Sequence, residues 1–204
     1  MSNKYLPTKS NMIKLKDSLD SSMQGYELLE RKRIILTKEI ERYEEKNNYL
    51  EKELYEMIGY GKELIKEVNI DIGIDNFINI ANGVKIDDYI DIKNITLMGV
   101  EIPSIIHKQE IAQRDYGFFN TTNKVDEAML YFNKIQEKLI EYALLYTTIL
   151  RLKREVEKVR KRSNALQNII IPEMERNLKE ITEQLEERER EEFSRLKIVK
   201  KRTE

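Results

Sequence analysis

Cysteine is absent from this chain of 204 residues, and histidine is nearly absent. Without cysteine the chain can form neither disulfides nor thiolate metal sites, and a single histidine, His107, does not make a metal site. Long apolar runs are missing too, because no stretch approaches the roughly 18 residues that a membrane-spanning helix needs. The N-terminus lacks the apolar core of a signal peptide. We therefore expect a cytoplasmic protein that holds no cofactor and does not insert into a membrane.

An excess of one charge is also lacking. The chain has 36 Lys and Arg against 37 Asp and Glu, a formal net charge of -1, so we expect no general attraction to nucleic acid. Two stretches, 151–162 and 195–202, are locally basic. We interpret them as exposed helix faces or as contacts for an acidic protein surface, and nucleic-acid binding is the less favoured interpretation.

Helix breakers are scarce and unevenly placed. The chain has 7 Gly and 3 Pro, and most of the glycines lie between residues 59 and 117. After residue 118 only Pro172 interrupts the chain. Charged residues make up 36% and hydrophobic residues 40% of the sequence, a mixture typical of coiled coils rather than of a globular core.

The sequence does contain a long apolar repeat. Between residues 12 and 68, 17 positions follow one another at alternating steps of three and four, and we call them the seam positions. Apolar residues occupy 13 of them: Met12, Leu15, Leu19, Tyr26, Leu29, Leu36, Ile40, Tyr43, Leu50, Leu54, Met57, Leu64 and Val68. The exceptions are Ser22, Arg33, Asn47 and Gly61, and for Asn47 we favour a role in selecting the helix pairing. This period of 3.5 predicts a helix that supercoils around a partner helix, with Thr8 or Ser10 as its N-cap.

Residues 69–120 differ in character. They contain eight acidic and four basic residues and several glycines. Apolar and polar residues alternate at Val84, Ile86, Ile90 and Ile92, at Ile95 and Leu97, and at Val100 and Ile102. A period of two predicts short strands. We expect a small β-hairpin region with a turn near Lys93-Asn94 and a bulge at Gly99.

From about residue 121 the helical period returns. One series comprises Val125, Ala128, Phe132, Ile135, Leu139 and Tyr142, and a second comprises Leu145, Ile149, Leu152, Val156, Val159, Leu166 and Ile170. The step of three between Tyr142 and Leu145 predicts a local skip in the coil. Pro172 cannot donate a backbone hydrogen bond, which predicts a kink or one broken turn. Met174, Leu178, Ile181, Leu185 and Leu196 continue the stripe beyond it.

These patterns predict a mainly α fold, a long antiparallel two-helix coiled coil with a small β-hairpin region at the loop end. We divide the chain into an N-terminal coiled-coil helix (1–68), a β-hairpin and loop region (69–120) and a C-terminal coiled-coil helix (121–204). The expected core includes Leu15, Leu19, Leu29, Leu36, Ile40, Leu166, Ile170 and Leu185. A parallel dimer through each helix is the alternative, and the similar helix lengths favour pairing within one chain.

Motifs of catalysis are missing from this pattern. No nucleophile–base pair, phosphate-binding loop or metal motif is recognisable, so we predict that the protein is not an enzyme. Five acidic residues lack the spacing of a calcium-binding EF-hand loop: Asp71, Asp75, Asp87, Asp88 and Asp91. We interpret them as a solvated acidic surface or as a docking face for a basic partner.

Two stretches resemble the D subunit of V-type and A-type rotary ATPases, which is the central-stalk shaft of those complexes. The first contains Pro7-Thr8-Lys9, Leu15-Lys16, Leu19, Gly25, Leu28-Leu29 and Lys32-Arg33. The second runs from Arg162 through Asn164 to Pro172 and continues to Arg195 and Lys197. That family usually shows Arg-Val-Asn-Ala-Leu-Glu before its Ile-Pro, and here Ser163 replaces the Val and Gln167 the Glu.

The resemblance implies a rotor component without catalytic residues. It would carry torque between ATP hydrolysis or synthesis in the catalytic head and proton or sodium-ion transport in the membrane ring. The termini would enter the head formed by the A and B subunits, and the β-bearing end would bind the F subunit of the stalk and the membrane-side socket protein (named d or C). The chain would thus be cytoplasmic and peripheral to the membrane. The candidate head-contact residues are Pro7, Thr8, Lys9, Lys16, Gly25, Lys32, Arg33, Arg162, Asn164, Pro172, Arg195 and Lys197.

Another function remains compatible with the same residues. A coiled-coil adaptor or scaffold would need the same apolar repeat and would carry no torque. An enzyme is a distant third, because the sequence offers no recognisable catalytic constellation.

Overall fold

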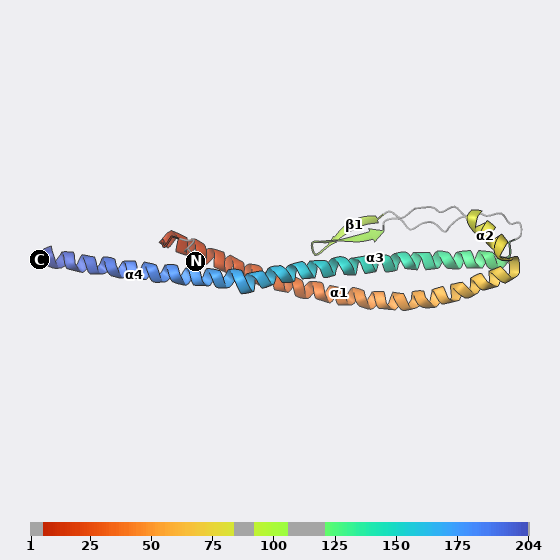
Figure 1. Cartoon of the computed structure of the whole chain (residues 1–204), viewed down its shortest axis with the longest axis horizontal. Coiled ribbons are helices and arrows are strands. Elements are labelled where there is room, and N and C mark those ends of the chain that lie inside the picture. Colours follow the sequence, from red (N-terminus) through yellow and green to blue (C-terminus); the bar gives the residue numbers. More distant parts are fainter. Residues whose placement is uncertain (1–5, 84–91, 106–120, 204) are drawn as a thin grey trace. The chain divides into compact units, whose positions relative to one another are not determined.

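The computed structural model describes residues 6–83, 92–105 and 121–203 (Figure 1). The chain divides into two compact units. The terminal unit comprises Met1–Ile35 and Val156–Glu204, and the central unit comprises Leu36–Glu155. The elements in chain order are α1 (Lys9–Ile72), α2 (Ile74–Gly83), β1 (Ile92–Leu97), β2 (Val100–Ile105), α3 (Asn123–Ala165), the π-helix η1 (Leu166–Ile170) and α4 (Ile171–Thr203). The predicted fold class, mainly α with a small antiparallel β-hairpin, is confirmed.

Helix α1 begins where Thr8 caps it. The backbone N–H of Asn11 donates to Thr8 Oγ1 at 3.3 Å, which satisfies one of the N–H groups that the first turn of a helix leaves unpaired. The side-chain amide of Asn11 donates to the carbonyl of Leu6 at 2.9 Å and ties the preceding residues to the helix start. Of the two predicted caps, Thr8 therefore holds the position, and Ser10 lies inside the helix.

The apolar repeat of α1 corresponds to one face of the helix. All 17 seam positions between residues 12 and 68 are buried or half-buried. The four exceptions follow the same rule: Asn47 and Gly61 are buried, and Ser22 and Arg33 are half-buried. The period of 3.5 thus continues through the non-apolar positions, because the partner segments cover the whole seam.

In the terminal unit, two helical segments run antiparallel. The Ser22 hydroxyl lies 3.7 Å from the sulfur of Met174, and Glu30 is hydrogen-bonded to Ser163, so residue numbers rise on one segment as they fall on the other. The buried apolar side chains of the unit are Leu15, Leu19, Val159 and Ile181. Leu29, Leu166 and Leu185 of the expected core are half-buried.

A π-turn precedes Pro172. The backbone N–H of Ile171 donates to the carbonyl of Leu166, five residues earlier, and Pro172 has no N–H with which to continue a regular ladder. The wider turn contains one extra residue, so the next inward-facing residue after Leu166 is Ile171. Ile170, which we expected in the core, is 36% exposed for this reason.

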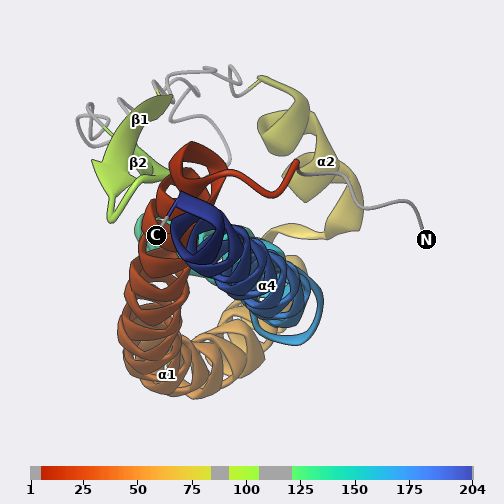
Figure 2. The ribbon, with the colours of Figure 1, turned by 90° about the vertical axis from the view of Figure 1, so that its left-hand side faces the viewer.

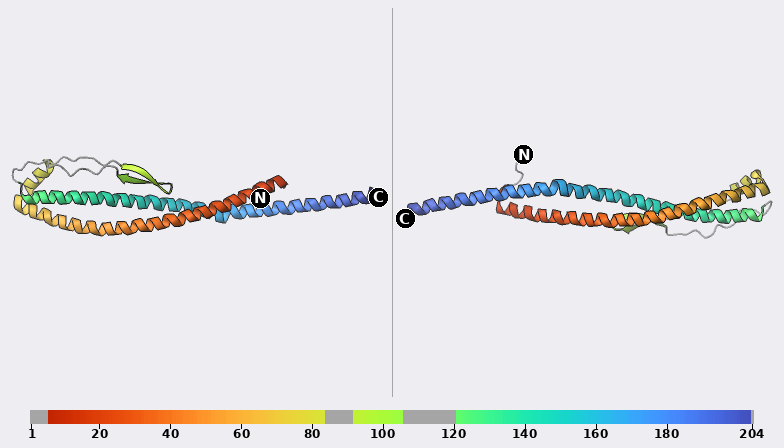
Figure 3. Two further views of the ribbon diagram at one scale, coloured as in Figure 1. Left: turned by 180° about the vertical axis from the view of Figure 1, so that it is seen from behind. Right: turned by 90° about the horizontal axis from the view of Figure 1, so that it is seen from below.

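The central unit also pairs two segments antiparallel. Three ion pairs mark the register: Lys153 with Glu44 at 2.6 Å, Lys138 with Glu53 at 3.2 Å, and Lys124 with Glu67 at 3.4 Å. Figure 3 shows these parts of α1 and α3 side by side in both views. The apolar core includes two clusters, one of Leu50, Leu54 and Ile135, the other of Leu64, Val68, Val125 and Ala128. The predicted core residues Leu36 and Ile40 are buried in this unit.

The inward face of α3 differs from the prediction by one residue. Phe132 is 37% exposed and Leu139 is 46% exposed, whereas Tyr131 packs against both apolar clusters. From Ile135 onward, the inward-facing positions keep the regular steps of three and four. The buried or half-buried residues on this face include Ile135, Tyr142, Leu145, Ile149 and Leu152. The predicted skip between Tyr142 and Leu145 is therefore wrong, and the irregular step lies between Ala128 and Tyr131.

Helix α2 was not predicted from the sequence. Gly73 adopts a φ of +80°, a left-handed conformation that glycine tolerates, and the chain turns away from α1 there (Figure 2). Phe77 and Ile80 of α2 pack against the cluster that contains Leu64 and Val125. We expected the β region to cap this end of the paired helices, and α2 packs there instead.

The β-hairpin has a shorter turn than we expected. Strands β1 and β2 pair antiparallel from Ile92 with Ile105 to Leu97 with Val100. Met98 and Gly99 connect them with φ values of 51° and 80°, as a type I′ turn requires. The predicted turn at Lys93-Asn94 is wrong because both residues pair within β1, and Gly99 belongs to the turn rather than to a bulge.

Several predictions concern residues outside the described ranges. They are the strand positions Val84, Ile86 and Ile90, the acidic residues Asp87, Asp88 and Asp91, and the single histidine, His107. These stay predictions from the sequence.

Candidate functional site

The twelve candidate contact residues all belong to the terminal unit, although the sequence separates them into two groups. Antiparallel pairing of α1 with α3, η1 and α4 brings the groups into one unit. The candidates do not form a single pocket among the described residues. What they share is a helical surface, on which some side chains are held by contacts and others face outward.

Pro7 and Lys9 are held by α4. The Arg188 guanidinium donates through Nη1 to the Pro7 carbonyl at 3.1 Å, and Lys9 Nζ lies 2.7 Å from Glu189 Oε1. The hydrogen bond with Glu189 raises the pKa of Lys9, and the same bond lowers the pKa of Glu189. Both side chains are largely exposed, so this pair orients the start of α1 more than it stabilises the fold.

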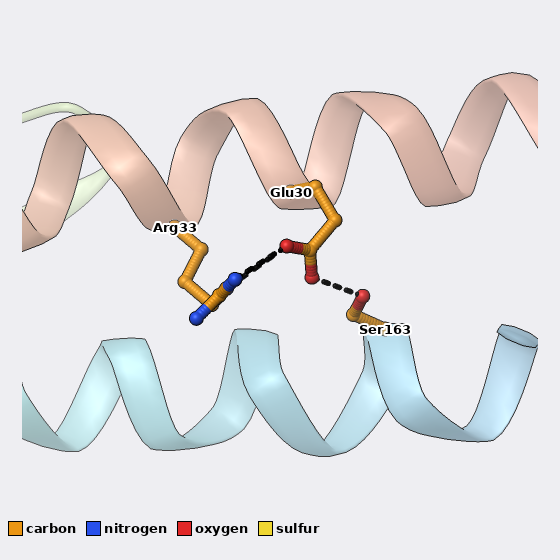
Figure 4. Close-up of polar contacts among 3 residues, drawn as sticks. All are labelled: Glu30, Arg33 and Ser163. Carbon is orange, nitrogen blue, oxygen red and sulfur yellow. Dashed lines mark hydrogen bonds and ion pairs between the residues drawn. The ribbon is translucent and has the colours of Figure 1, made fainter.

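Arg33 belongs to a polar cluster between the two helical segments (Figure 4). Glu30 Oε2 accepts from Arg33 Nη2 at 2.7 Å and from Arg33 Nε at 3.0 Å. Glu30 Oε1 accepts from the Ser163 hydroxyl at 2.5 Å. The hydrogen bond from Arg33, followed by that from Ser163, lowers the pKa of Glu30. Arg33 thus bonds to its own helix, while Glu30 connects the two segments.

Sequence reasoning missed Glu30. Two signals were available: Glu30 stands three residues before Arg33, a spacing at which opposite charges meet on a helix, and Ser163 brings a hydroxyl to a motif position where the resembled family usually has valine. Neither signal identifies the contact alone, because the pairing of residue 30 with residue 163 depends on the register between the segments.

Other candidates face outward. Lys16, Arg162, Asn164 and Lys197 are exposed, whereas Lys32 and Pro172 are half-buried. A Cβ atom on Gly25 would meet nothing within 4 Å. The chain's own packing therefore does not explain why a glycine, which costs roughly 1 kcal/mol relative to alanine inside a helix, occupies this position.

The last part of α4 is exposed along its whole length. Every residue from 186 to 201 is exposed, including Phe193 at 70% and Leu196 at 67%. Arg195 lies 3.6 Å from Glu191, one turn earlier. No helix in the described ranges is long and apolar enough to cross a membrane. This end of α4 is therefore a surface of interspersed charges and apolar side chains that is available to a partner.

Arg151 fixes the β-hairpin in the central unit. Its Nη1 donates to the Glu101 carbonyl at 2.9 Å and to Asn94 Oδ1 at 3.2 Å. We expected this basic residue to be an exposed position or a contact for an acidic surface, and its actual partners are a backbone carbonyl and an amide of the hairpin. At the start of α3, Lys124 Nζ lies 3.3 Å from Asp71 Oδ2, so this acidic residue, which we interpreted as part of a solvated surface or a docking face, pairs with a lysine of the chain itself.

Comparisons with known proteins find relatives along almost the whole chain. The family model for the D subunit of ATP synthase matches residues 11–201. The V-type ATP synthase D subunit of Thermotoga neapolitana is 35% identical over 196 residues, which cover 96% of this chain and 97% of that protein. The A-type ATP synthase D subunit of Pyrococcus horikoshii is 36% identical over 200 residues, covering 97% and 94%. That of Methanosphaera stadtmanae is 33% identical over 202 residues, covering 96% and 92%.

Proposed function

Because the chain belongs to the family of ATP synthase D subunits, we propose that it is the central-stalk rotor shaft of a V-type or A-type rotary ATPase. In this role it performs no bond chemistry. It carries torque between the catalytic head, where ATP is hydrolysed or made, and the membrane ring that moves protons or sodium ions. The observation that carries the proposal is the extent of the match, which includes both helical segments and the β-hairpin between them.

The two units would have different partners. The terminal unit would lie within the head formed by the A and B subunits, because it holds all twelve candidate contact residues. The central unit, with its β-hairpin, would bind the F subunit of the stalk and the membrane-side socket protein (d or C). The complex would place the chain at the cytoplasmic side of the membrane, peripheral to it.

A rotor must transmit torque and must also leave each position in turn. The seam supports the first requirement, because all 17 positions of α1 are buried or half-buried and resist separation of the paired segments. The exposed end of α4 supports the second. Its charges lie near opposite charges of the same helix, such as Arg195 near Glu191, and exposed ion pairs contribute little individually. Contacts of this kind with the head would form and break at low cost.

The decisive experiment immobilises the shaft. The variant Lys197→Cys carries the only cysteine of a chain that otherwise has none. It is assembled with the head and membrane components, and its cysteine is oxidised to form a disulfide with a cysteine in the facing head protein. We expect ATP hydrolysis and ion transport to stop together and to return on reduction. The same chain without the head cysteine is the control for oxidation. If the locked complex hydrolyses ATP and transports ions at full rate, the chain does not turn, and a static adaptor becomes the better description.

A further inference from the structure

Two members of the polar cluster in the terminal unit stand at inward-facing positions of the kind that apolar residues fill elsewhere. Arg33 is a seam position of α1, and Ser163 is 1% exposed on the inward face of α3. The carboxylate of Glu30 uses one oxygen for each of them (Figure 4). The buried hydroxyl of Ser163 thus donates to the carboxylate of Glu30 on the opposite helical segment. The guanidinium of Arg33, on the same helix as Glu30, holds that carboxylate.

Apolar seams specify register weakly. Leucine and isoleucine side chains at repeating positions can meet other apolar side chains after one segment slides along the other, whereas a polar pair at one position penalises every register in which it is not formed. A shift by one turn displaces Ser163 by about 5.4 Å, which breaks its bond to Glu30 and leaves the hydroxyl buried without its acceptor.

The π-turn makes register important at this point. It begins at Leu166, three residues after Ser163, and moves the inward stripe by one residue, from Ile170 to Ile171. A single insertion of this kind matches the facing helix in one alignment only. The seam beyond it, which includes Met174 and Ile181, therefore depends on the register that is set before it.

We propose that the Glu30–Ser163 hydrogen bond fixes the axial register of the two helical segments of the terminal unit, and that Arg33 positions Glu30 for this bond. Glu30 and Ser163 form the contact between segments, and Arg33 acts through Glu30 by holding its second oxygen. The proposal concerns the pairing of the helices and does not depend on whether the chain carries torque.

Register can be measured by disulfide trapping in the full-length chain. Ser22 and Met174 face each other, so the double variant Ser22→Cys with Met174→Cys reports the native register. Ser22→Cys with Ile171→Cys, and with Leu178→Cys, report shifts of one turn in either direction, because Ile171 and Leu178 are half-buried positions on either side of Met174 and a disulfide needs Cα atoms about 4.4–6.8 Å apart. Each pair is oxidised at low protein concentration in the parent and in Ser163→Ala.

In Ser163→Ala we expect the ratio of native to shifted crosslinks to fall about tenfold or more, as loss of a hydrogen bond to a charged group implies. Ser163→Thr keeps a hydroxyl and should retain the parent ratio. Val159→Ala, a matched truncation at a buried position one turn earlier, should lower stability without producing shifted crosslinks. An unchanged ratio in Ser163→Ala overturns the proposal, as does an equal shift in Val159→Ala.

The role of Arg33 has its own test. Arg33→Met keeps a long side chain in the seam and leaves both Glu30 and Ser163 in place. We expect shifted crosslinks in this variant too, at a level between the parent and Ser163→Ala. If Ser163→Ala proves unfolded by circular dichroism, the test uses Arg33→Met alone. A ratio of native to shifted crosslinks in Arg33→Met equal to that of the parent refutes the positioning of Glu30 by Arg33.

Discussion

Gly61 of α1 and Phe132 of α3 approach each other so closely that a Cβ atom on Gly61 would lie 3.2 Å from Phe132 Cζ. Ile135 Cδ1 would lie equally close, at 3.2 Å. Gly59, two residues earlier on the same helix, would place a Cβ with nothing within 4 Å. The two glycines thus share a helical backbone and differ in what surrounds them, which makes them a matched pair.

The first prediction uses this pair. Gly59→Ala should stabilise the chain by about 1 kcal/mol, the usual difference in helix propensity between glycine and alanine. Gly61→Ala should gain less, because Phe132 and Ile135 must move to admit the methyl group, and Gly61→Leu should destabilise the chain by about 1–3 kcal/mol through overpacking. Urea unfolding followed by circular dichroism measures the three differences. Equal stability of Gly59→Leu and Gly61→Leu would show that the close approach has no energetic consequence.

The second prediction compares two isoleucines of the terminal unit. Ile181 is fully buried and Ile170, beside the π-turn, is 36% exposed. Ile181→Ala should cost about 2–5 kcal/mol, since it removes buried methyl groups and leaves a cavity. Ile170→Ala should cost less than about 1 kcal/mol, because alanine also favours the helix. Unfolding free energies from denaturant titration give both values.

The outcome also tests the position of the π-turn. If the helix were regular through Pro172, Ile170 would face inward, and the two substitutions would have similar costs. A large cost for Ile170→Ala together with a small one for Ile171→Ala would contradict the one-residue displacement of the stripe.

Periodicity predicts the parts of this fold that depend on a repeated contact. The seam of α1 follows from the sequence because every third or fourth residue meets the same partner, and even Arg33 and Asn47 fit that period. The stripe of α3 could not be placed in the same way. Tyr131 and Phe132 are adjacent aromatic residues, and only packing against α1 decides that Tyr131 faces inward.

Local geometry was harder to predict than periodicity. Gly73 and Gly83 indicated a loop, although they lie at the two ends of α2, where glycines commonly terminate helices. Pro172 indicated a disturbance but not its form, since a kink and a π-turn both accommodate a missing N–H. Glu30 escaped prediction because its cross-helix partner, Ser163, follows only from the register.

The third prediction concerns the acid stability of the polar cluster. Hydrogen bonds from Arg33 and then Ser163 lower the pKa of Glu30 below its ordinary value of 4.5, so the folded chain binds this proton less tightly than the unfolded chain. The resulting stabilisation is present above pH 4.5 and is lost as pH falls through the lowered pKa of the folded state. Glu30→Gln removes this titration, so its loss of stability on acidification should be smaller than that of the parent.

Thermal melting at a series of pH values below neutrality measures the difference between the two profiles. Arg33→Met provides the control, because it removes the largest cause of the lowered pKa while keeping the carboxyl group. Its profile should approach that of Glu30→Gln. Parallel profiles for the parent and Glu30→Gln would mean that the cluster contributes nothing to the pH dependence of folding.

The last prediction separates folding from coupling at the exposed end of α4. Truncation after Phe193 removes residues that make no buried contact, since positions 186–201 are all exposed, so the melting temperature should stay close to that of the full chain. The deleted segment carries Leu196, Val199 and several basic residues, which we assign to contacts with the head. The assembled complex should therefore transport fewer ions per ATP hydrolysed.

A matched control, Leu196→Ser in the full chain, removes one apolar side chain and should lower coupling less than the truncation does. Parallel measurement of ATPase activity and ion uptake in vesicles decides the matter: full coupling in the truncated complex would place the torque-bearing contacts elsewhere on the terminal unit, whereas a lowered melting temperature would show that the segment packs against the chain itself.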